Sequence, residues 1–341
     1  MKKLLIMRFS AMGDVAMTVP VIHSLATQHP ELRITVVTRS RFTPMYHWMP
    51  SNVEVKPVDL NNYKGIGGLN KLYNELKERK FDTVADLHNV LRTKYLRYRF
   101  RLSGAQVATI DKGRSEKKEY MGKGSTGEKL KPMVERYSEV FRELGFSITL
   151  DYQRAFSPLE ESISQLRSIV GEKAKGTKWI GVAPFAAHDS KVYPLEKMHE
   201  VVKMLQTKGY KVFLFGAGEK EKSILESWGS ENIISTCGKL SGLHNEMVLM
   251  SKLDLMIAMD SANMHIAAIV GTPTLSIWGA THPNVGFTGW GQTEDNIIQL
   301  DLQCRPCSVY GNKPCAFGDL RCLNGISSDM ICERAISLIE R

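Results

Sequence analysis

The stretch between Asp254 and Gly279 constrains the fold more than any other part of the chain. It contains two apolar runs of strand length, Leu255–Met259 and Thr274–Trp278, separated by a short polar turn, an apolar stretch of helix length and the sequence Gly-Thr-Pro. Two buried strands joined by a helix predict a unit in which both strands run parallel in one sheet. The polar turn then lies at the carboxyl end of the first strand, where open parallel sheets bind ligands.

Strand-length apolar runs alternate with helix-length amphipathic stretches along the whole chain, which predicts an α/β fold with parallel sheets. The 341 residues suffice for two domains. The extended polar segment 145–157 is the candidate linker, so we expect two similar halves facing across a cleft, residues 1–150 and 151–341. The expected strands are Lys3–Met7, Arg33–Val37, Val53–Val58, Thr83–Leu87, Gln106–Ile110, Trp179–Pro184, Lys211–Phe215, Ile233–Thr236, Leu255–Met259 and Thr274–Trp278. The expected helices are Pro20–Gln28, Leu69–Arg79, Lys131–Leu144, Leu195–Thr207, Lys220–Ser227, His244–Ser251 and Ser328–Arg341.

The composition, with 43% hydrophobic and 24% charged residues, is that of a soluble globular protein. A net charge of +9 favours an anionic partner, either nucleic acid, a membrane surface or a phosphorylated substrate. Arg8 interrupts the first apolar run, which excludes a signal peptide, and no window approaches the ~18 apolar residues of a membrane span. We therefore expect a cytoplasmic protein that contacts a membrane only at its surface.

The polar turn after Met259 offers three candidate ligand contacts, Asp260, Ser261 and His265. The free backbone N–H groups at a helix start favour an anion, so we expect an anion site lined by these side chains. The alternative is that Asp260 or Ser261 only caps the helix. A cap, however, does not need a histidine one turn later.

The turn after the first expected strand reads Arg8-Phe-Ser10-Ala-Met-Gly13-Asp14. It has neither the G-x-G-x-x-G pattern of dinucleotide folds nor a P-loop pattern. It instead presents the Asp14 carboxylate at the carboxyl edge of the sheet, where this group could accept a proton from a substrate hydroxyl. The helix start would keep the carboxylate ionised. The alternative is an N-cap that stabilises the helix by ~1 kcal/mol.

Two further turns follow expected strands in the second half. The turn between Ala183 and Pro194 contains Lys191, which could pair with a phosphate or could simply be solvated. The next turn reads Phe-Gly-Ala-Gly-Glu219, where the glycines permit close backbone approach and Glu219 could accept hydrogen bonds from ribose hydroxyls. The alternative for Glu219 is a helix cap.

Most of the net charge lies between Arg92 and Lys123, where ten Lys or Arg residues outnumber three Asp or Glu residues. Aromatic residues interleave with these cations, so the segment could bind an anionic acceptor or nucleic acid. The alternative is a solvated amphipathic face, which we favour for Arg97, Arg99 and Arg101.

Four cysteines near the end have the spacing Cys304-x2-Cys307-x7-Cys315-x6-Cys322. The first spacing suits one zinc ion and the others are unusual, so a structural metal and packed or redox-labile thiols both remain open. We expect the two lone cysteines to be buried as small apolar residues: Cys237 and Cys332.

These motifs together resemble those of glycosyltransferase family 9, the ADP-heptose:lipopolysaccharide heptosyltransferases. The opening segment 6–20 is similar to the start of that family. The block 260–268, the following Gly-Thr-Pro and Trp278-Gly-Ala-Thr281 resemble its C-terminal motif. Ser190-Lys191 with the segment 193–197 resembles its middle motif, and a cysteine-rich tail occurs in many members.

The resemblance implies a GT-B fold with two Rossmann-like domains. The N-terminal domain, residues 1–150, would bind the acceptor, and the C-terminal domain, residues 151–341 with the cysteine-rich tail, would bind the nucleotide sugar. It also implies an inverting transfer of heptose from ADP-heptose to a lipopolysaccharide core acceptor, without a cofactor or catalytic metal, at the cytoplasmic face of the inner membrane.

The resemblance also implies roles for individual residues. By motif position, Asp14 is similar to the catalytic base, Lys191 to the residue that contacts the diphosphate and sugar, and Glu219 to the residue at the ribose. The residues that match the donor-binding C-terminal motif are Asp260 at the sugar and Ser261, Ala262 and His265 at the pyrophosphate. The family commonly has glycine where this chain has Ala262. We place the acceptor beside Ser10, Gly13, Arg92, Lys112 and Arg114.

Other functions remain alternatives at this point. The chain could use another nucleotide-sugar donor or act as a nucleotide-sugar epimerase, and the basic segment 92–123 could bind nucleic acid. We favour a glycosyltransferase whose partners are a nucleotide sugar, an anionic glycolipid acceptor and the cytoplasmic membrane surface, with no nucleic acid.

Overall fold

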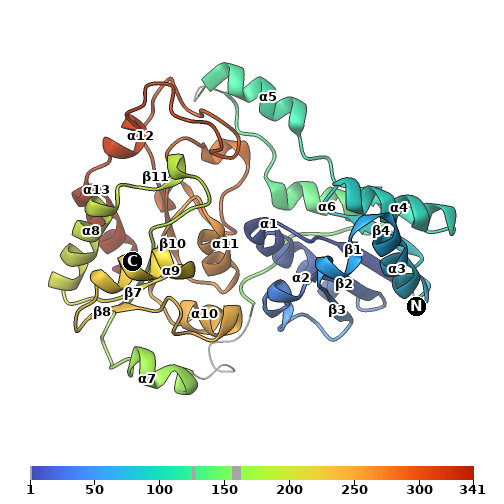
Figure 1. Ribbon diagram of the computed structural model, residues 1–341, viewed down its shortest axis with the longest axis horizontal. Helices are drawn as coiled ribbons and strands as arrows, with labels where there is room; N and C mark the ends of the chain where they lie inside the picture. Colours follow the sequence, from blue (N-terminus) through green and yellow to red (C-terminus); the bar gives the residue numbers. More distant parts are fainter. Residues whose placement is uncertain (1, 125–126, 156–162) are drawn as a thin grey trace. The chain divides into compact units, whose positions relative to one another are not determined.

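The computed structural model describes residues 2–124, 127–155 and 163–341. The chain divides into two compact units, each with its own parallel sheet. The first unit comprises Met1–Lys112 and Lys131–Ala155, and the second comprises Gly113–Leu130 and Phe156–Arg341. Figure 1 draws the strands of the first unit in blue and cyan and those of the second unit from green to orange.

The sheet of the first unit has five parallel strands in the order β3-β2-β1-β4-β5. The strands are β1 (Lys3–Met7), β2 (Arg33–Arg39), β3 (Val53–Val58), β4 (Thr83–Asp86) and β5 (Gln106–Thr109). The helices are α1 (Met12–Ala16), α2 (Thr18–Gln28), α3 (Gly65–Lys77), α4 (Leu91–Leu102) and α6 (Met133–Glu143). All five predicted strands are confirmed. The apolar runs of β1, β2 and β4 are buried, whereas the outer strands β3 and β5 are only partly buried.

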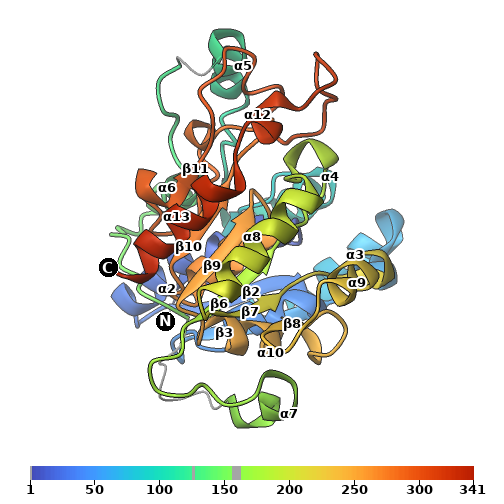
Figure 2. The ribbon, with the colours of Figure 1, turned by 90° about the vertical axis from the view of Figure 1, so that its left-hand side faces the viewer.

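The sheet of the second unit has six parallel strands in the order β11-β10-β9-β6-β7-β8. These strands are β6 (Trp179–Ala183), β7 (Lys211–Leu214), β8 (Ile233–Ser235), β9 (Leu255–Met259), β10 (Thr274–Ile277) and β11 (Ile297–Ile298). The helices are α7 (Arg167–Val170), α8 (Leu195–Thr207), α9 (Gly218–Ser227), α10 (Gly242–Met250), α11 (Ala262–Ile269), α12 (Arg321–Asn324) and α13 (Ser328–Ile339). In Figure 2, α8 and α13 lie beside each other against this sheet.

In each sheet the order of the strands reverses at one position, so that earlier strands lie on one side of it and later strands on the other. It lies between β1 and β4 in the first sheet and between β6 and β9 in the second. In register, Met7 lies beside Asp86, and Ala183 lies beside Ala258. Ligands of doubly wound sheets bind outside the carboxyl ends of such neighbouring strands. This geometry selects the loops after β1, β4, β6 and β9 as candidate sites.

One segment differs from the predicted division near residue 150. Helix α5 (Arg114–Lys123) was not predicted, and contacts place its segment 113–130 in the second unit. The Tyr120 hydroxyl lies 3.1 Å from His282 Nδ1, and the Lys117 ammonium lies 4.2 Å from the centroid of the Phe287 ring. Gly113 makes the turn into α5 possible, since it adopts a left-handed φ of 59°.

The candidate linker is only partly a separate segment. Between Phe146 and Ala155 the described chain forms neither helix nor strand, and Phe146 and Tyr152 are buried against the first unit. Ser24 Oγ accepts a hydrogen bond of 3.0 Å from the backbone N–H of Asp151. The end of the proposed linker, residues 156 and 157, lies outside the described residues. Within the described part of the chain, no helix combines the length and apolar character that crossing a membrane would require.

Candidate functional site

Asp14 lies on the short helix α1, directly after the loop that follows β1. Its Oδ2 lies 2.7 Å from a terminal nitrogen of Arg8 and accepts a hydrogen bond of 3.1 Å from the backbone N–H of Ala11. Among the described residues both contacts engage Oδ2 and none engages Oδ1. Ala11 is the N-cap of α1, so Asp14 is not the N-cap that the alternative proposed. Its carboxylate lies in the first turn, bonds the N–H of that N-cap and keeps Oδ1 available to a substrate hydroxyl.

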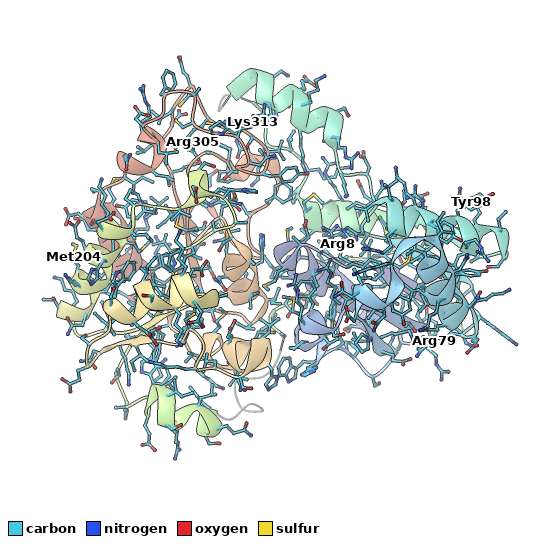
Figure 3. The ribbon with its side chains drawn as sticks, in the orientation of Figure 1. Arg8, Arg79, Tyr98, Met204, Arg305 and Lys313 are labelled. Carbon is cyan, nitrogen blue, oxygen red and sulfur yellow. The ribbon has the colours of Figure 1, made fainter. Side chains whose placement is uncertain are left out.

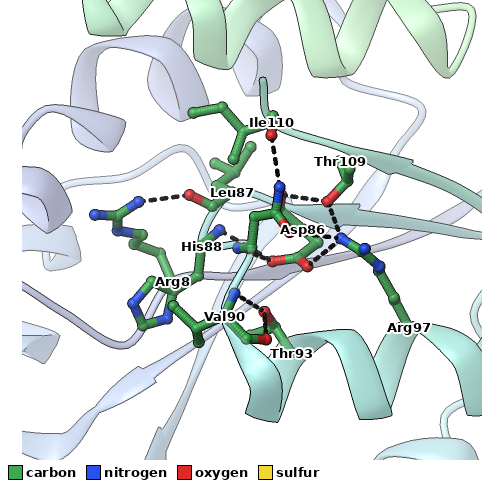
Figure 4. A network of polar contacts seen from close by, with 10 residues as sticks. Arg8, Asp86, Leu87, His88, Val90, Thr93, Arg97, Thr109 and Ile110 are labelled. Atoms are coloured by element: carbon green, nitrogen blue, oxygen red, sulfur yellow. Dashed lines mark hydrogen bonds and ion pairs between the residues drawn. The ribbon is translucent and has the colours of Figure 1, made fainter. Parts of the chain in front are cut away.

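Arg8 fixes this carboxylate from inside the fold. Its side chain is buried, and its other terminal nitrogen donates a 2.6 Å hydrogen bond to the Leu87 carbonyl after β4 (Figure 4). Burial lowers the pKa of Arg8, but nearby Tyr137 and Asp14 raise it, and the net pKa lies above its ordinary value. Arg8 thus remains a permanent cation beside Asp14.

His88, in the loop after β4, completes a group that we call the Asp14 site: Arg8, Ser10, Asp14 and His88. The Ser10 hydroxyl lies 3.3 Å from His88 Nε2. Burial, followed by the charges of Arg8 and Lys112, lowers the pKa of His88 to about 3, so the imidazole is neutral near pH 7. Within the described chain, His88 Nδ1 is buried without a hydrogen-bond partner.

The expected acceptor residues divide between the two units. Ser10 and Gly13 precede Asp14 in the same turn, and the charges of Arg92 and Lys112 act on His88, so these four residues lie near the Asp14 site. Arg114 instead lies exposed on α5 in the second unit. The contact of Arg114 with the acceptor therefore stays a prediction.

The arginines of α4 are only partly the solvated face that we predicted. Arg97 donates a 3.1 Å hydrogen bond to the buried carboxylate of Asp86 (Figure 4). Arg99 lies 4.4 Å from the Tyr73 ring centroid, whereas Arg101 is exposed. The prediction was wrong for Arg97 and Arg99, because the acid that ends β4 contacts Arg97 and a ring on α3 contacts Arg99.

The second candidate group lies at the carboxyl ends of β6 and β9, and we call it the Lys191 site: Lys191, Asp260, Ser261 and Thr281. The Lys191 ammonium lies 2.8 Å from Asp260 Oδ2, and the Thr281 hydroxyl donates a 2.7 Å hydrogen bond to the same oxygen. Both members of the ion pair are largely buried. Lys191 is therefore held in place rather than solvated.

The start of α11 lies directly after Asp260. Ser261 occupies the N-cap position, yet its hydroxyl makes no capping bond and is buried with no partner in the described chain. Asp260 bonds Lys191 and Thr281 instead, so the capping alternative does not account for either residue. Ala262 is helical, so its conformation needs no glycine, and His265 is buried one turn later. Free N–H groups and an unpaired hydroxyl suit an anion.

The cysteine-rich segment 304–322 makes hydrogen bonds that support the loops of the Lys191 site. The buried Arg305 (Figure 3) donates to the carbonyls of Gly279 at 2.5 Å and Thr281 at 2.8 Å. Ser190 donates a 2.6 Å hydrogen bond to the carbonyl of Gly311. These bonds fix the loops that carry Thr281 and Lys191.

Glu219 is the most exposed of the expected donor contacts, with 92% of its side chain accessible. It lies in the first turn of α9, where Glu221, rather than Glu219, accepts a 2.7 Å hydrogen bond from the backbone N–H of Ala217. The capping role that we gave as the alternative for Glu219 thus belongs to Glu221. Glu219 remains available to a ligand.

None of the four spaced cysteines, all of which the structure describes, forms a disulfide. Among the described residues, no group of three or more His, Cys, Asp or Glu side chains has the arrangement to hold a metal ion. Backbone N–H groups, first that of Phe317, lower the pKa of Cys315, whereas burial raises the pKa values of Cys307 and Cys322. The two lone cysteines are buried, as predicted: Cys237 and Cys332.

Sequence reasoning identified Asp14, Lys191 and Asp260 but assigned no role to Arg8, His88 or Thr281. Arg8 and Thr281 stood inside the quoted motifs, and a cation six residues before a candidate base is a signal that could have been used. His88 had no comparable signal, because only the pairing of β1 with β4 brings it beside Ser10.

Three comparisons with known proteins bear on this geometry. The sequence profile of glycosyltransferase family 9 (heptosyltransferase) matches residues 69–316. The chain is 25% identical over 332 residues to lipopolysaccharide heptosyltransferase 1 of Pseudomonas aeruginosa, covering 89% of this chain and 86% of that protein. It is 26% identical over 310 residues to lipopolysaccharide heptosyltransferase 3 of Escherichia coli, covering 86% of each. The solved structure of the E. coli heptosyltransferase WaaC with ADP matches with a TM-score of 0.68 at 17% identity, over 98% of this chain and 99% of that one.

Proposed function

This chain belongs to glycosyltransferase family 9, the heptosyltransferases, and has that family's GT-B fold. From this premise we propose that it transfers heptose from ADP-heptose to a lipopolysaccharide core acceptor at the cytoplasmic face of the membrane. The observation that carries the proposal is the Lys191 site at the start of α11, which lies within the residues that match the family.

The donor half of the reaction is assigned to the second unit. A nucleotide diphosphate carries the negative charge that Lys191, the Ser261 hydroxyl and the N–H groups of α11 can bind. Asp260, bonded to Lys191 and Thr281, orients the ammonium and contacts the sugar. The E. coli relative has been solved with ADP, which supports ADP as the nucleotide.

The acceptor half is assigned to the first unit. Asp14 takes the proton of the acceptor hydroxyl through Oδ1, while Arg8 holds Oδ2. The hydroxyl oxygen then bonds to the anomeric carbon of the donor as the bond to the diphosphate oxygen breaks, which inverts that carbon. Lys191 and the start of α11 stabilise the charge that develops on the leaving diphosphate.

A transfer assay with purified components tests this proposal. ADP-heptose and a heptose-free lipopolysaccharide core are incubated with the protein, and mass spectrometry should show the acceptor gaining one heptose residue. ADP at about a hundredfold excess over its Kd should also stabilise the fold by ~2–3 kcal/mol. A response in calorimetry to UDP or GDP but not to ADP would reject the donor assignment. Free heptose or an epimerised donor without a glycosylated acceptor would reject the transfer.

A further inference from the structure

The outward face of α4 carries three large apolar side chains that the fold does not cover. Leu91 is 85% exposed, Tyr98 is 60% exposed and Leu102 is 68% exposed. Their spacings of seven and four residues place them on one line along the helix, since each residue turns ~100°. Figure 3 shows Tyr98 on α4, at the margin of the first unit.

The opposite, inward face of the same helix packs α4 against the rest of the first unit. Thr93, Leu96 and Phe100 are buried, and the Phe100 ring packs against Tyr73 with centroids 5.0 Å apart. The outer stripe lies on the opposite side, so α4 is apolar on two faces. Large apolar side chains exposed along one face of a helix indicate an interaction surface.

Basic residues border the stripe. Lys94 and Arg101 are exposed and follow the stripe along one side, and within the described residues neither side chain has an acidic partner. The helix contains five Lys or Arg residues and no Asp or Glu. Of the other three cations, Arg97 and Arg99 are held by Asp86 and Tyr73, and Arg92 lies near His88. The charge of this surface therefore complements an anionic partner.

We infer that the outer face of α4 is the surface by which this protein docks on an anionic lipid bilayer. Leucine and tyrosine on a helix flanked by lysine and arginine are what an interfacial helix inserts at the boundary between headgroups and acyl chains. Nucleic acid would use the cations but would leave Leu91 and Leu102 without an apolar environment. The stripe therefore favours lipid over nucleic acid.

The apolar stripe lies close to the Asp14 site, so docking on a bilayer would bring that site near the membrane. Leu91 begins α4 directly after the loop that holds His88, and the neighbouring Arg92 acts electrostatically on His88. A bilayer on this face would lie beside the Asp14 site of the same unit. This consequence rests on the proposed function, because only a glycolipid acceptor would be presented from the membrane.

A vesicle sedimentation assay with the full chain tests the docking surface without any enzymatic turnover. The vesicles contain either phosphatidylethanolamine with phosphatidylglycerol or phosphatidylcholine alone. Wild-type protein should bind the anionic vesicles, and the binding should weaken as salt rises. The triple variant Leu91→Ser, Tyr98→Ser, Leu102→Ser should bind them at least ~10-fold more weakly, because it loses most of the apolar area that would insert.

The controls separate docking from folding. Phe317→Ser with Met330→Ser removes exposed apolar side chains from the second unit and should leave binding unchanged. Lys94→Glu with Arg101→Glu reverses exposed charges on α4 and should abolish the preference for anionic vesicles. If the triple variant has a lowered Tm, its weaker binding could reflect misfolding, and this charge-reversal variant then provides an independent test. Equal vesicle binding by wild type and both α4 variants would overturn the inference, as would binding to an RNA oligonucleotide without binding to vesicles.

Activity measurements distinguish this inference from the proposed function. With a delipidated core oligosaccharide as acceptor, the triple variant should retain the wild-type kcat/KM. With the acceptor embedded in anionic vesicles, its kcat/KM should fall ~10-fold or more, in step with binding. Absence of transfer by wild type to either acceptor would reject the proposed function, whereas the sedimentation result would still decide the docking surface.

Discussion

The ion pairs of the two candidate sites differ in which member, the cation or the carboxylate, is the more exposed. In the Asp14 site the arginine side chain is only 4% exposed and the carboxylate 27%, whereas in the Lys191 site the lysine is 13% exposed and the carboxylate 9%. Both pairs lie beyond the carboxyl ends of neighbouring strands where strand order reverses. The more exposed member of each pair fits the proposed chemistry: a carboxylate for proton transfer in one unit and a cation for anion binding in the other.

The choice of cation follows the same logic. A guanidinium does not lose its proton in proteins, so Arg8 can hold one oxygen of Asp14 while the other works as a base. An ammonium is a compact point charge that can exchange one anionic partner for another. In the Lys191 site, an incoming diphosphate would compete with Asp260 for Lys191.

The largest expected effect comes from removing the exposed carboxylate. Asp14→Asn keeps the shape and the hydrogen bond to Ala11 but cannot take a proton, so kcat should fall ~10²–10⁴-fold while donor affinity stays nearly constant. Steady-state kinetics with ADP titrations would measure both quantities. Asp59→Asn, which alters another capping aspartate, is the matched control. Wild-type turnover in Asp14→Asn would reduce Asp14 to a cap.

Removing the cation of the second pair should act on the donor instead. Lys191→Met should lower kcat/KM by about 10²-fold and weaken ADP binding, because the leaving diphosphate loses its positive partner. Lys191→Arg should retain part of both. The exposed Lys220 of the next turn provides the control Lys220→Met. Unchanged ADP affinity in Lys191→Met, measured by calorimetry, would contradict the assignment.

The two units should lose stability in acid over different pH ranges. Burial with Arg8 and Lys112 lowers the pKa of His88 to about 3, and burial with Arg305 lowers the pKa of His282 to about 4. The unfolded chain binds protons more tightly at both positions. The stability contributed by each neutral histidine is therefore complete above about pH 6.5 and is lost as the pH falls toward the folded pKa.

Urea unfolding at a series of pH values would measure this difference. Between pH 7 and pH 5 each histidine should account for a loss of ~2 kcal/mol. Below about pH 4 only His88 should continue to contribute, because its folded pKa is the lower. His88→Gln and His282→Gln should each flatten the pH slope, His88→Gln over the wider range. A slope unaffected by either substitution would contradict the burial of these rings as neutral groups.

A smaller effect separates two neighbouring acids of the donor unit. Glu219→Ala should raise the Kd for ADP ~10-fold if Glu219 binds the ribose, since hydrogen bonds to charged groups are worth ~1.5–3 kcal/mol. Glu221→Ala should leave that Kd unchanged and lower stability by ~1 kcal/mol through the lost cap at Ala217. Titration calorimetry would measure the Kd for ADP, and thermal unfolding would measure stability. A raised Kd in Glu221→Ala but not in Glu219→Ala would contradict the assignment.

The smallest expected effect is that of metal removal. The diphosphate charge is balanced by Lys191 and helix N–H groups in the proposed reaction, so transfer should survive EDTA. Loss of turnover without loss of folding would contradict that mechanism. Metal analysis beside the assay would address the cysteines, because stoichiometric zinc whose removal lowers the Tm would identify a structural role for the segment 304–322.

The sequence predicted the Lys191 site better than the Asp14 site, for a physical reason. Asp260 and Ser261 stand together between a strand and a helix, so local pattern alone places them at a sheet edge. His88 joins the Asp14 site only through the pairing of β1 with β4, across a long sequence separation. The helix α5 escaped prediction for a related reason: its packing partners, His282 and Phe287, lie in the other half of the chain.

The sequence by itself determined the parallel α/β architecture, since alternating apolar and amphipathic runs admit few other arrangements, and it marked Asp14, Lys191 and Asp260. The tertiary structure alone decided which partner each one has. Arg8 contacts Asp14, and Asp260, which accepts a hydrogen bond from Thr281, holds Lys191. Arg97 turns inward to Asp86, whereas Leu91 and Leu102 stay exposed. Periodicity shows that a helix has two sides, but only the packed neighbours determine which side remains uncovered.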